Sequence, residues 1–144
     1  MHICSYVHDC ESKFMRDLTR LLKALSEESR LRVLSLLIER ECCVCEVMQV
    51  MGVSQSKASR TLTALFDAGI LKQRKQGRWV LYSIDHEGMK APMKDIVLAV
   101  SRAMAGNLLV AVDRERLTTA QRVGPGCASK ACDSREVAEA PEPG

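Results

Sequence analysis

Apolar residues recur at helical spacing over the first forty positions of this chain. From residue 11 to residue 25 they fall every three or four positions, which is the spacing of one helix face; the face comprises Phe14, Leu18, Leu21, Leu22 and Leu25. A second helix is predicted to begin at Ser26, a residue suited to the N-cap, and to end near Glu39. Its core-facing positions are Leu31, Leu34, Leu37 and Ile38.

Two shorter helices are expected next. One opens at the cysteine-rich stretch 41–45 and ends at Gly52, a residue that can adopt the left-handed conformation that terminates a helix. The other follows the N-cap residue Ser54, runs from about 55 to 68, and ends at Gly69. A short helix, a turn of about three residues with glycine, and a second helix with a polar face predict a helix-turn-helix.

The hydrophobic period changes to two after residue 70. Residues 70–75 and 79–84 flank the sequence Gln-Gly-Arg at 76–78, which predicts a β-hairpin with Arg78 at its tip. A hairpin directly after a helix of the recognition type is typical of a wing.

One more helix is predicted over about 92–112, with Pro92 in its first turn. We expect its apolar stripe to pack on the first helix and on a second subunit; the stripe comprises Met93, Ile96, Val97, Val100, Met104, Leu108 and Ala111. The predicted fold class is therefore mainly α with a small β-hairpin, a winged helix-turn-helix whose dimer is built on the first and last helices. The expected organisation is a flexible N-terminal arm (1–10), a winged helix-turn-helix DNA-binding and dimerisation domain (11–115), and a flexible cysteine-containing tail (116–144).

Composition and charge indicate the partner and the compartment. Of the 144 residues 47% are hydrophobic and only 3% aromatic, so the core must be largely aliphatic. No apolar run approaches the roughly 18 residues of a membrane span, and residues 1–10 lack an apolar signal core, so we expect a cytoplasmic protein that does not enter a membrane. Residues 54–79 carry six Lys or Arg against one Asp, whereas residues 127–144 carry a net charge of −2. This asymmetry favours a polyanion, double-stranded DNA, as the partner of the middle of the chain.

Seven cysteines lie in three clusters, at 4/10, 42/43/45 and 127/132. In a reducing compartment such clusters favour metal or thiol chemistry over a disulfide framework. Thiolates select soft ions: three sulfurs suit As(III) or Sb(III), and four suit Cd(II), Pb(II) or Zn(II). The candidate ligands are Cys43, Cys45, Cys42, Cys4 and Cys10. Cys127 and Cys132 are further candidates, and the sequence leaves their role open.

The chain resembles the ArsR/SmtB family of dimeric winged-helix metal-sensing repressors. Four segments resemble the family's helices and wing: residues 24–34, 53–62, 68–71 and 77–82. The stretch Cys43-Val44-Cys45-Glu46-Val47 is similar to the Cys-Val-Cys-Asp-Leu box of the arsenic-sensing and cadmium/lead-sensing branches. It implies a homodimeric repressor, not an enzyme, that leaves operator DNA of an arsenic-resistance operon when As(III) or Sb(III) binds.

The sequence departs from the family at two positions. Met48 stands where the arsenic branch often has a third cysteine, and Thr61 stands where many relatives have histidine. The third ligand must therefore come from elsewhere in the protein. The alternatives that stay open are a Cd(II)/Pb(II)-responsive repressor, a thiol redox or persulfide sensor on the same fold, and a soft-metal buffer whose head no longer binds DNA.

Two mechanistic expectations follow. Residues two apart on a helix point about 200° apart, so Cys43 and Cys45 are expected to share an ion only if the first helical turn unwinds, which would re-aim residues 54–66 and release DNA. The start of the recognition helix is expected to contact the edges of the DNA bases through Gln55, Ser56, Ser59 and Arg60. Lys57 is expected to contact a phosphate, and Arg78 is expected to contact DNA from the tip of the wing.

Overall fold

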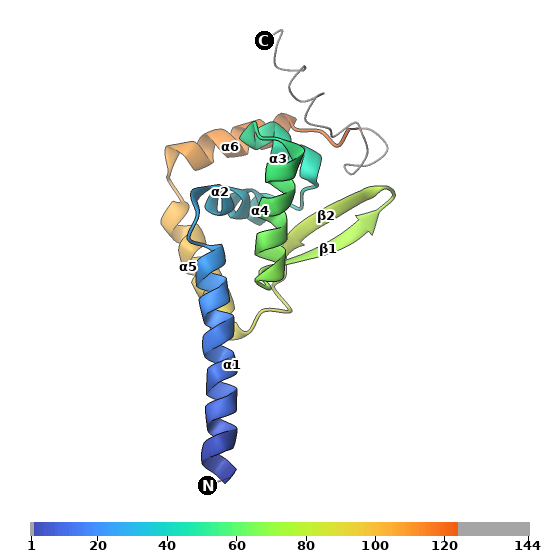
Figure 1. The fold of residues 1–144 in the computed structure, drawn as a ribbon. Coiled ribbons are helices and arrows are strands. Elements are labelled where there is room, and N and C mark those ends of the chain that lie inside the picture. The colour runs from blue at the N-terminus through green and yellow to red at the C-terminus, as the bar shows by residue number, and fades with distance from the viewer. Residues whose placement is uncertain (1, 124–144) are drawn as a thin grey trace.

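The computed structural model describes the backbone of residues 2–123 and the side chains from residue 9 onward. It contains six helices and one two-stranded sheet within that range (Figure 1). In chain order they are α1 (His2–Ala24), α2 (Glu28–Glu39), α3 (Val44–Met51), α4 (Gln55–Asp67), β1 (Leu71–Gln76), β2 (Trp79–Ile84), α5 (Ala91–Met104) and α6 (Leu108–Thr119). The predicted mainly helical winged helix-turn-helix is confirmed.

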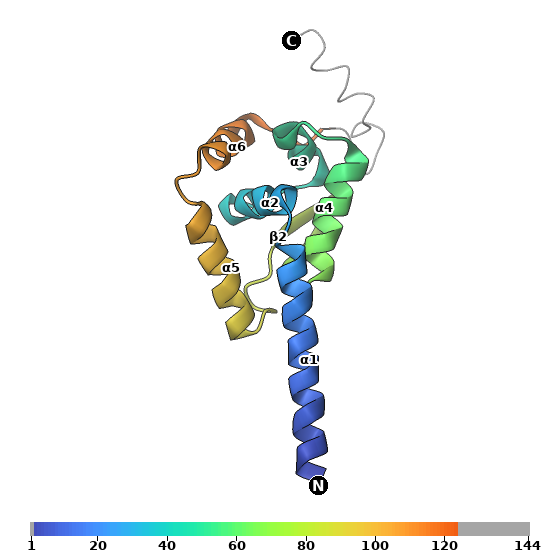
Figure 2. The ribbon, with the colours of Figure 1, turned by 60° about the vertical axis from the view of Figure 1, so that its left-hand side comes forward.

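Helix α2 forms the centre of the molecule. Helices α4, α5 and α6 and strand β2 of the wing pack against it (Figure 2). Its sequence is almost continuously apolar from Val33 to Leu37, and these positions are buried, because a helix enclosed on several sides needs apolar residues around most of its circumference. Ile38, predicted to face the core, is instead 40% exposed.

Helix α1 is longer than the sequence predicted. Residues 2–10, expected to form a flexible arm, continue the helix, and residues 2–24 contain neither glycine nor proline to interrupt it. Only the C-terminal part of α1 enters the core, through Leu21 and Ala24, and the remainder projects from the body (Figure 1). Met15 and Leu22 are 61% and 49% exposed, so part of the apolar face of α1 is uncovered in the single chain.

The helix-turn-helix agrees closely with the prediction. Gly52 ends α3 with φ 66°, a left-handed conformation that glycine adopts at no steric cost. Ser54 caps α4, because its side-chain oxygen accepts a hydrogen bond from the backbone N–H of Lys57 at 3.2 Å. The wing pairs Gln76 with Trp79, which leaves Gly77 and Arg78 as the two-residue turn.

The predicted last helix over 92–112 is wrong. Helix α5 stops at Met104, and α6 leaves it at an angle of 97°. Gly106 has φ 88°, and the Asn107 side chain accepts hydrogen bonds from the N–H groups of Leu109 (2.9 Å) and Val110 (3.2 Å), which starts a new helix. The Gly106-Asn107 pair indicates this break in the sequence. Because apolar residues continue at helical spacing on both sides of the pair, the sequence analysis predicted one uninterrupted helix.

The break changes which apolar residues are buried. Leu108 is 82% exposed and Ala111 is also exposed, so neither extends the buried stripe of α5, which includes Met93 and Val97. Helix α6 packs instead on α2 and α3. Within residues 2–123, no single helix is long and apolar enough to cross a membrane. Helices α5 and α6 reach that length and apolar character only as a pair, and the pair is sharply bent.

The Asn107 cap gives a first prediction. Asn107→Ala removes the side-chain acceptor at the start of α6, and we expect it to lower the free energy of unfolding by about 1 kcal/mol. Urea denaturation followed by circular dichroism measures the change. Asn107→Ser restores an N-cap acceptor and should recover most of it, whereas equal losses in both variants would contradict a capping role.

Candidate functional site

The cysteine stretch joins α2 to α3 and is fixed to the wing. The backbone N–H of Cys42 donates to the Tyr82 carbonyl at 3.0 Å, and the Tyr82 N–H donates to the Cys42 carbonyl at 2.8 Å. The Cys42 side chain is fully buried and carries a free thiol. Burial, reinforced by the nearby Glu46 carboxylate, raises the pKa of Cys42 to about 12, so this sulfur is held in its neutral form in the core.

Cys43 and Cys45 occupy different conformational environments. Cys43 is the N-cap residue of α3, with extended backbone angles of φ −98° and ψ 174°, whereas Cys45 lies within the first turn. The expectation that both lie on the helix is therefore wrong for Cys43, and an intact α3 does not by itself separate their side chains by 200°. Both side chains are buried and both sulfurs are disulfide-bonded, in contrast to the free thiols of Cys10 and Cys42.

Glu46 is a buried carboxylate directly behind the two cysteines. One of its oxygens accepts hydrogen bonds from the backbone N–H of Cys43 at 2.9 Å and from Nε of Arg122 at 3.2 Å. The other accepts from Nη1 of Arg40 at 2.6 Å. Glu46 is only 2% exposed, so these partners replace the water that a buried charge has lost. The start of α3 is thus tied to the end of α2 and to the chain after α6.

Residues 108–123, here called the C-terminal strap, contact α3 at two further residues, Gln49 and Val50. The Gln121 N–H donates to the Gln49 side chain at 3.0 Å, and the Gln49 amide donates back to the Gln121 carbonyl at 2.6 Å. Nη1 of Arg116 donates to the Val50 carbonyl at 3.2 Å. No local pattern predicts these contacts, because they join residues 66 to 76 positions apart.

A buried ion pair anchors the strap to α2. Asp113 is fully buried, and both of its carboxylate oxygens accept hydrogen bonds from Arg32, each at 2.8 Å. The hydrogen bonds that Arg32 donates to Asp113 raise the pKa of Arg32, so the guanidinium keeps its charge. The sequence analysis assigned no role to Asp113, because nothing near it in the chain marks it as buried.

Cys4 and Cys10 lie on α1, at the opposite end of the molecule from α3 (Figures 1 and 2). Cys10 is fourteen residues before the end of α1, a rise of roughly 21 Å along the helix axis. Within residues 9–123 no cluster of three or more His, Cys, Asp or Glu side chains is arranged to hold a metal. The side chains of Cys4, Cys127 and Cys132 lie outside the described residues.

An exposed ion pair joins the cysteine stretch to strand β1. Glu41 accepts hydrogen bonds from both Nε (3.0 Å) and Nη2 of Arg74. The Arg74 guanidinium lowers the pKa of the Glu41 carboxyl through this contact, although Glu41 is not deeply buried. The pair therefore orients the wing relative to α3 more than it stabilises the fold.

This pair gives a second prediction. Arg74→Ala should raise the pKa of Glu41 toward its ordinary value, because the hydrogen-bonding cation is lost. Side-chain carboxyl chemical shifts measured by NMR over a pH titration report the change. Because the pair is solvated, we expect the free energy of unfolding to change little. A Glu41 pKa that does not move in Arg74→Ala would contradict the assigned cause.

The first two turns of α4 present a polar surface. Ser56 and Arg60 are exposed, and Gln55, Lys57 and Ser59 are half-buried. Thr61 is only 5% exposed, and its hydroxyl donates to the Lys57 carbonyl at 2.9 Å, so it contributes little to this surface.

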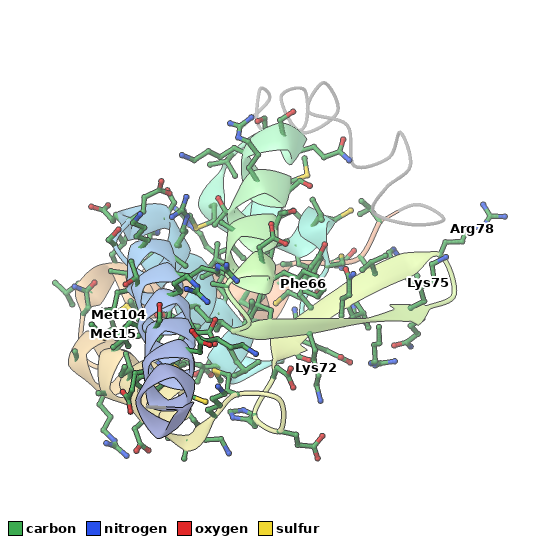
Figure 3. The ribbon with its side chains drawn as sticks, turned by 60° about the horizontal axis from the view of Figure 1, so that its bottom comes forward. Met15, Phe66, Lys72, Lys75, Arg78 and Met104 are labelled. Atoms are coloured by element: carbon green, nitrogen blue, oxygen red, sulfur yellow. The ribbon has the colours of Figure 1, made fainter. Side chains whose placement is uncertain are left out.

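The wing adds three exposed basic side chains. Arg78 and Lys75 lie at its far end, and Lys72 lies nearer the body (Figure 3). The start of α4 and the wing, which are adjacent elements of the chain, therefore both carry basic side chains that reach solvent.

Comparisons with known proteins agree with this geometry. Residues 27–73 match the family described as "Bacterial regulatory protein, arsR family". The chain is 40% identical over 75 residues to the cadmium resistance transcriptional regulatory protein CadC homolog of Staphylococcus aureus, covering 51% of this chain and 62% of that protein. It is 44% identical over 66 residues to the arsenical resistance operon repressor of Escherichia coli (strain K12), covering 45% and 56%. The match thus spans less than two-thirds of either protein.

A third relative is matched over more of its length. The chain is 35% identical over 72 residues to the arsenical resistance operon repressor of Staphylococcus xylosus, covering 50% of this chain and 69% of that protein.

Two solved structures share the fold. One is the homodimeric winged helix-turn-helix DNA-binding domain Mb0332 from Mycobacterium bovis, with a TM-score of 0.57, 26% identity, and coverage of 68% of this chain and 87% of that one. The other is reduced HlyU from Vibrio cholerae N16961, with a TM-score of 0.55, 27% identity, and coverage of 66% and 96%.

Proposed function

Since the chain belongs to the arsR family of bacterial regulatory proteins, we propose that it is a transcriptional repressor that binds double-stranded operator DNA as a homodimer. We further propose that As(III) or Sb(III), bound by the thiolates of Cys43 and Cys45, releases it from an arsenic-resistance operator. The observation that carries the proposal is the position of these two cysteines at the start of α3, the helix that packs directly on the recognition helix α4.

The donor set supports a soft ion. Both cysteine side chains are buried beside a helix N-terminus, where thiolates are favoured. Once reduced, such positions suit a trivalent thiophilic ion better than Mg(II) or Ca(II). Cys42 is assigned instead to the core, because its neutral buried thiol is fixed by the backbone bridge to Tyr82. Cd(II) or Pb(II) is the alternative inducer, as the name of the S. aureus relative suggests.

Helix α3 couples the two sites as a rigid unit. Val47, Met48 and Val50 are buried in the core that also contains Leu62 and Leu65 of α4. Close-packed interiors transmit displacement, so a shift of α3 on ligation moves the recognition helix without unwinding a turn. A coupling free energy of about 1–3 kcal/mol changes DNA affinity by about 5–150-fold.

The dimer is assigned to α1 and α5. The projecting part of α1 leaves Met15 and Leu22 exposed, and a second copy would cover this apolar surface. The M. bovis domain, which shares the fold and is homodimeric, supports a dimer. A two-fold dimer should read half-sites separated by about one helical turn of DNA.

The experiment that tests the function is a titration on promoter DNA. Reduced protein is bound to a fluorescent fragment of its own promoter and titrated with As(III), Sb(III), Cd(II), Pb(II) and Zn(II), with anisotropy as the readout. We expect As(III) and Sb(III) to release the DNA at the lowest concentrations. Promoter DNA that stays bound with every ion would contradict the proposal, and failure of the free protein to bind promoter DNA would instead favour a metal buffer.

A third prediction separates base readout from backbone contact. Arg60→Ala should relax operator specificity by about 1–3 kcal/mol, because a side chain at the start of α4 reads base edges. Arg78→Ala should weaken operator and non-specific DNA alike and reduce the slope of log affinity against log salt by about 1, because the wing tip contacts phosphate. Competition binding at several salt concentrations measures both. The assignment fails if the two variants show the same pattern.

The second candidate function is that of a thiol redox sensor. It is favoured by the oxidised state of Cys43 and Cys45 in the structure. If this hypothesis holds, an oxidant should release the protein from DNA in the presence of a metal chelator, and mass spectrometry should find a disulfide without bound metal. Release by arsenite under reducing conditions distinguishes the metalloid sensor from it.

A further inference from the structure

A small pocket lies between the start of α2 and the start of α4. Its volume is about 130 Å³, roughly the space of four water molecules in the liquid and enough for a phosphate group. The residues that line it come from both helices: Glu27, Arg30, Lys57, Arg60 and Thr61. Three of these side chains are cations and only one is a carboxylate, so this pocket, here called the α2/α4 pocket, favours an anion.

Arg30 carries a buried hydrogen-bond donor without a partner. Its Nε is shielded from bulk water and has no acceptor within residues 9–123. Its Nη1 donates to the Lys23 carbonyl at 3.2 Å, and its Nη2 lies 3.8 Å from the Glu27 carboxylate, too far for a hydrogen bond. A buried donor that stays unpaired costs free energy, and a donor of this kind commonly takes a water or an ion as its partner. An anion in the α2/α4 pocket would supply that acceptor.

The α2/α4 pocket adjoins the polar surface at the start of α4. Lys57 and Arg60 line it from the first two turns of that helix, where we expect contacts to phosphate and to base edges. Arg30 adds a cation from α2, a helix that the sequence analysis did not connect with DNA. Because backbone phosphates flank the groove that a recognition helix enters, a DNA phosphate is the anion expected to come nearest to this position.

We propose that the α2/α4 pocket holds one backbone phosphate of the operator, which Arg30 and Lys57 bind from two different helices. This inference rests on the proposed function and adds a DNA contact from outside the helix-turn-helix and the wing. Contacts to phosphate carry no sequence information, but they fix the register of a protein on the duplex. A phosphate held here lies next to Arg60 and keeps the start of α4 in register with the bases. Glu27, the one carboxylate, is 47% exposed and can turn to solvent when the phosphate enters.

The test compares a charge removed inside the pocket with a charge removed elsewhere. Arg30→Gln should weaken binding to promoter DNA and to a duplex of unrelated sequence by the same factor, about ten-fold at low salt. It should also reduce the slope of log affinity against log salt by about 0.9 for each subunit, because one phosphate contact is lost. Glu27→Gln removes the opposing carboxylate and should strengthen both complexes by about two-fold. Anisotropy over a series of salt concentrations measures all of these values.

Arg114→Gln is the matched control. Arg114 pairs with Glu39 at 3.1 Å, at the other end of α2 from Arg30, a rise of roughly 14 Å along the helix axis. The control removes the same charge from a side chain that is also partly exposed, and it should change neither the affinity nor the salt slope. An Arg30→Gln variant that behaves like Arg114→Gln would overturn the proposal.

A second measurement uses the unaltered protein. The Nε–H resonance of Arg30 in ¹⁵N-labelled protein, identified by comparison with Arg30→Gln, should shift when promoter DNA is added, because the donor gains a phosphate acceptor. A resonance that does not move contradicts the contact. Inorganic phosphate, added at constant ionic strength, separates a free anion from DNA. If it shifts the same resonance but leaves DNA affinity unchanged, the pocket binds free phosphate and the DNA contact is wrong.

The proposed function fails separately from this contact. If DNA affinity depends on Arg30 as expected but arsenite does not release the DNA, the phosphate contact stands and the release mechanism is wrong. If arsenite releases wild type from promoter DNA but Arg30→Gln keeps wild-type affinity and salt slope, the proposed function stands and the phosphate contact is wrong.

Discussion

Replacement of both box cysteines, in Cys43→Ser/Cys45→Ser, should leave operator binding intact and abolish release by arsenite. Serine is a favourable N-cap residue, so the change at Cys43 preserves the start of α3, and metal-free DNA affinity should stay within about three-fold of wild type. Wild type should lose about 5–150-fold in affinity when arsenite binds, whereas the variant should lose less than about two-fold. Anisotropy on promoter DNA with and without arsenite measures both values.

Cys42→Ala is the control for this experiment. Cys42 is adjacent in sequence and equally buried, but its thiol belongs to the core, so this variant should lose some stability and keep its response to arsenite. Release that survives in Cys43→Ser/Cys45→Ser, or disappears in Cys42→Ala, would move the inducer site away from the Cys-Val-Cys box.

The second large effect is expected at the anchor of α6. Asp113→Leu removes both acceptors of the Arg32 guanidinium, which is 19% exposed, and leaves a largely desolvated cation without a partner. We expect a loss of about 3 kcal/mol in the free energy of unfolding, the lower end for a broken buried pair, because Arg32 can partly reach water. Urea denaturation measures it.

The matched control removes both charges. Arg32→Met/Asp113→Leu replaces the pair by apolar side chains of similar size and should recover most of the stability, since a buried pair contributes little net stability against a well-packed apolar equivalent. A loss below about 1 kcal/mol in Asp113→Leu alone would mean that the ion pair does not hold α6 against α2.

Most of the fold could be predicted because its signals are local. The turn at residues 52–54, the Ser54 cap and the two-residue hairpin turn each depend on residues a few positions apart, and the structure places all three where the sequence predicted them. The apolar spacing of α2 and α4 identified most of their buried faces in the same way. The Gly-Asn break before α6 was equally local, but apolar residues on both sides concealed it.

The surroundings of the cysteine pair could be predicted only in part. The Cys-Val-Cys spacing identified the candidate ligands, but it placed Cys43 on the helix rather than at the extended N-cap. No pattern indicated that Glu46 is buried between Arg40 and Arg122, because a lone glutamate in a first helical turn ordinarily lies in solvent. The sequence contains seven cysteines, but their positions along the chain do not show which of them are close in space.

By itself, the amino-acid sequence determined the first four helices, the helix-turn-helix, the wing, the basic residues and the presence of a soft-donor box, because periodicity, capping and turn chemistry act between near neighbours. The tertiary structure alone decided that α6 folds back over α3, that Asp113 and Glu46 are buried charges with arginine partners, and that Arg122 lies beside Cys43. These contacts join residues from 6 to 81 positions apart. The contacts between the most distant residues depend on how the aliphatic faces of the other helices pack against α2, and no local sequence pattern specifies that packing.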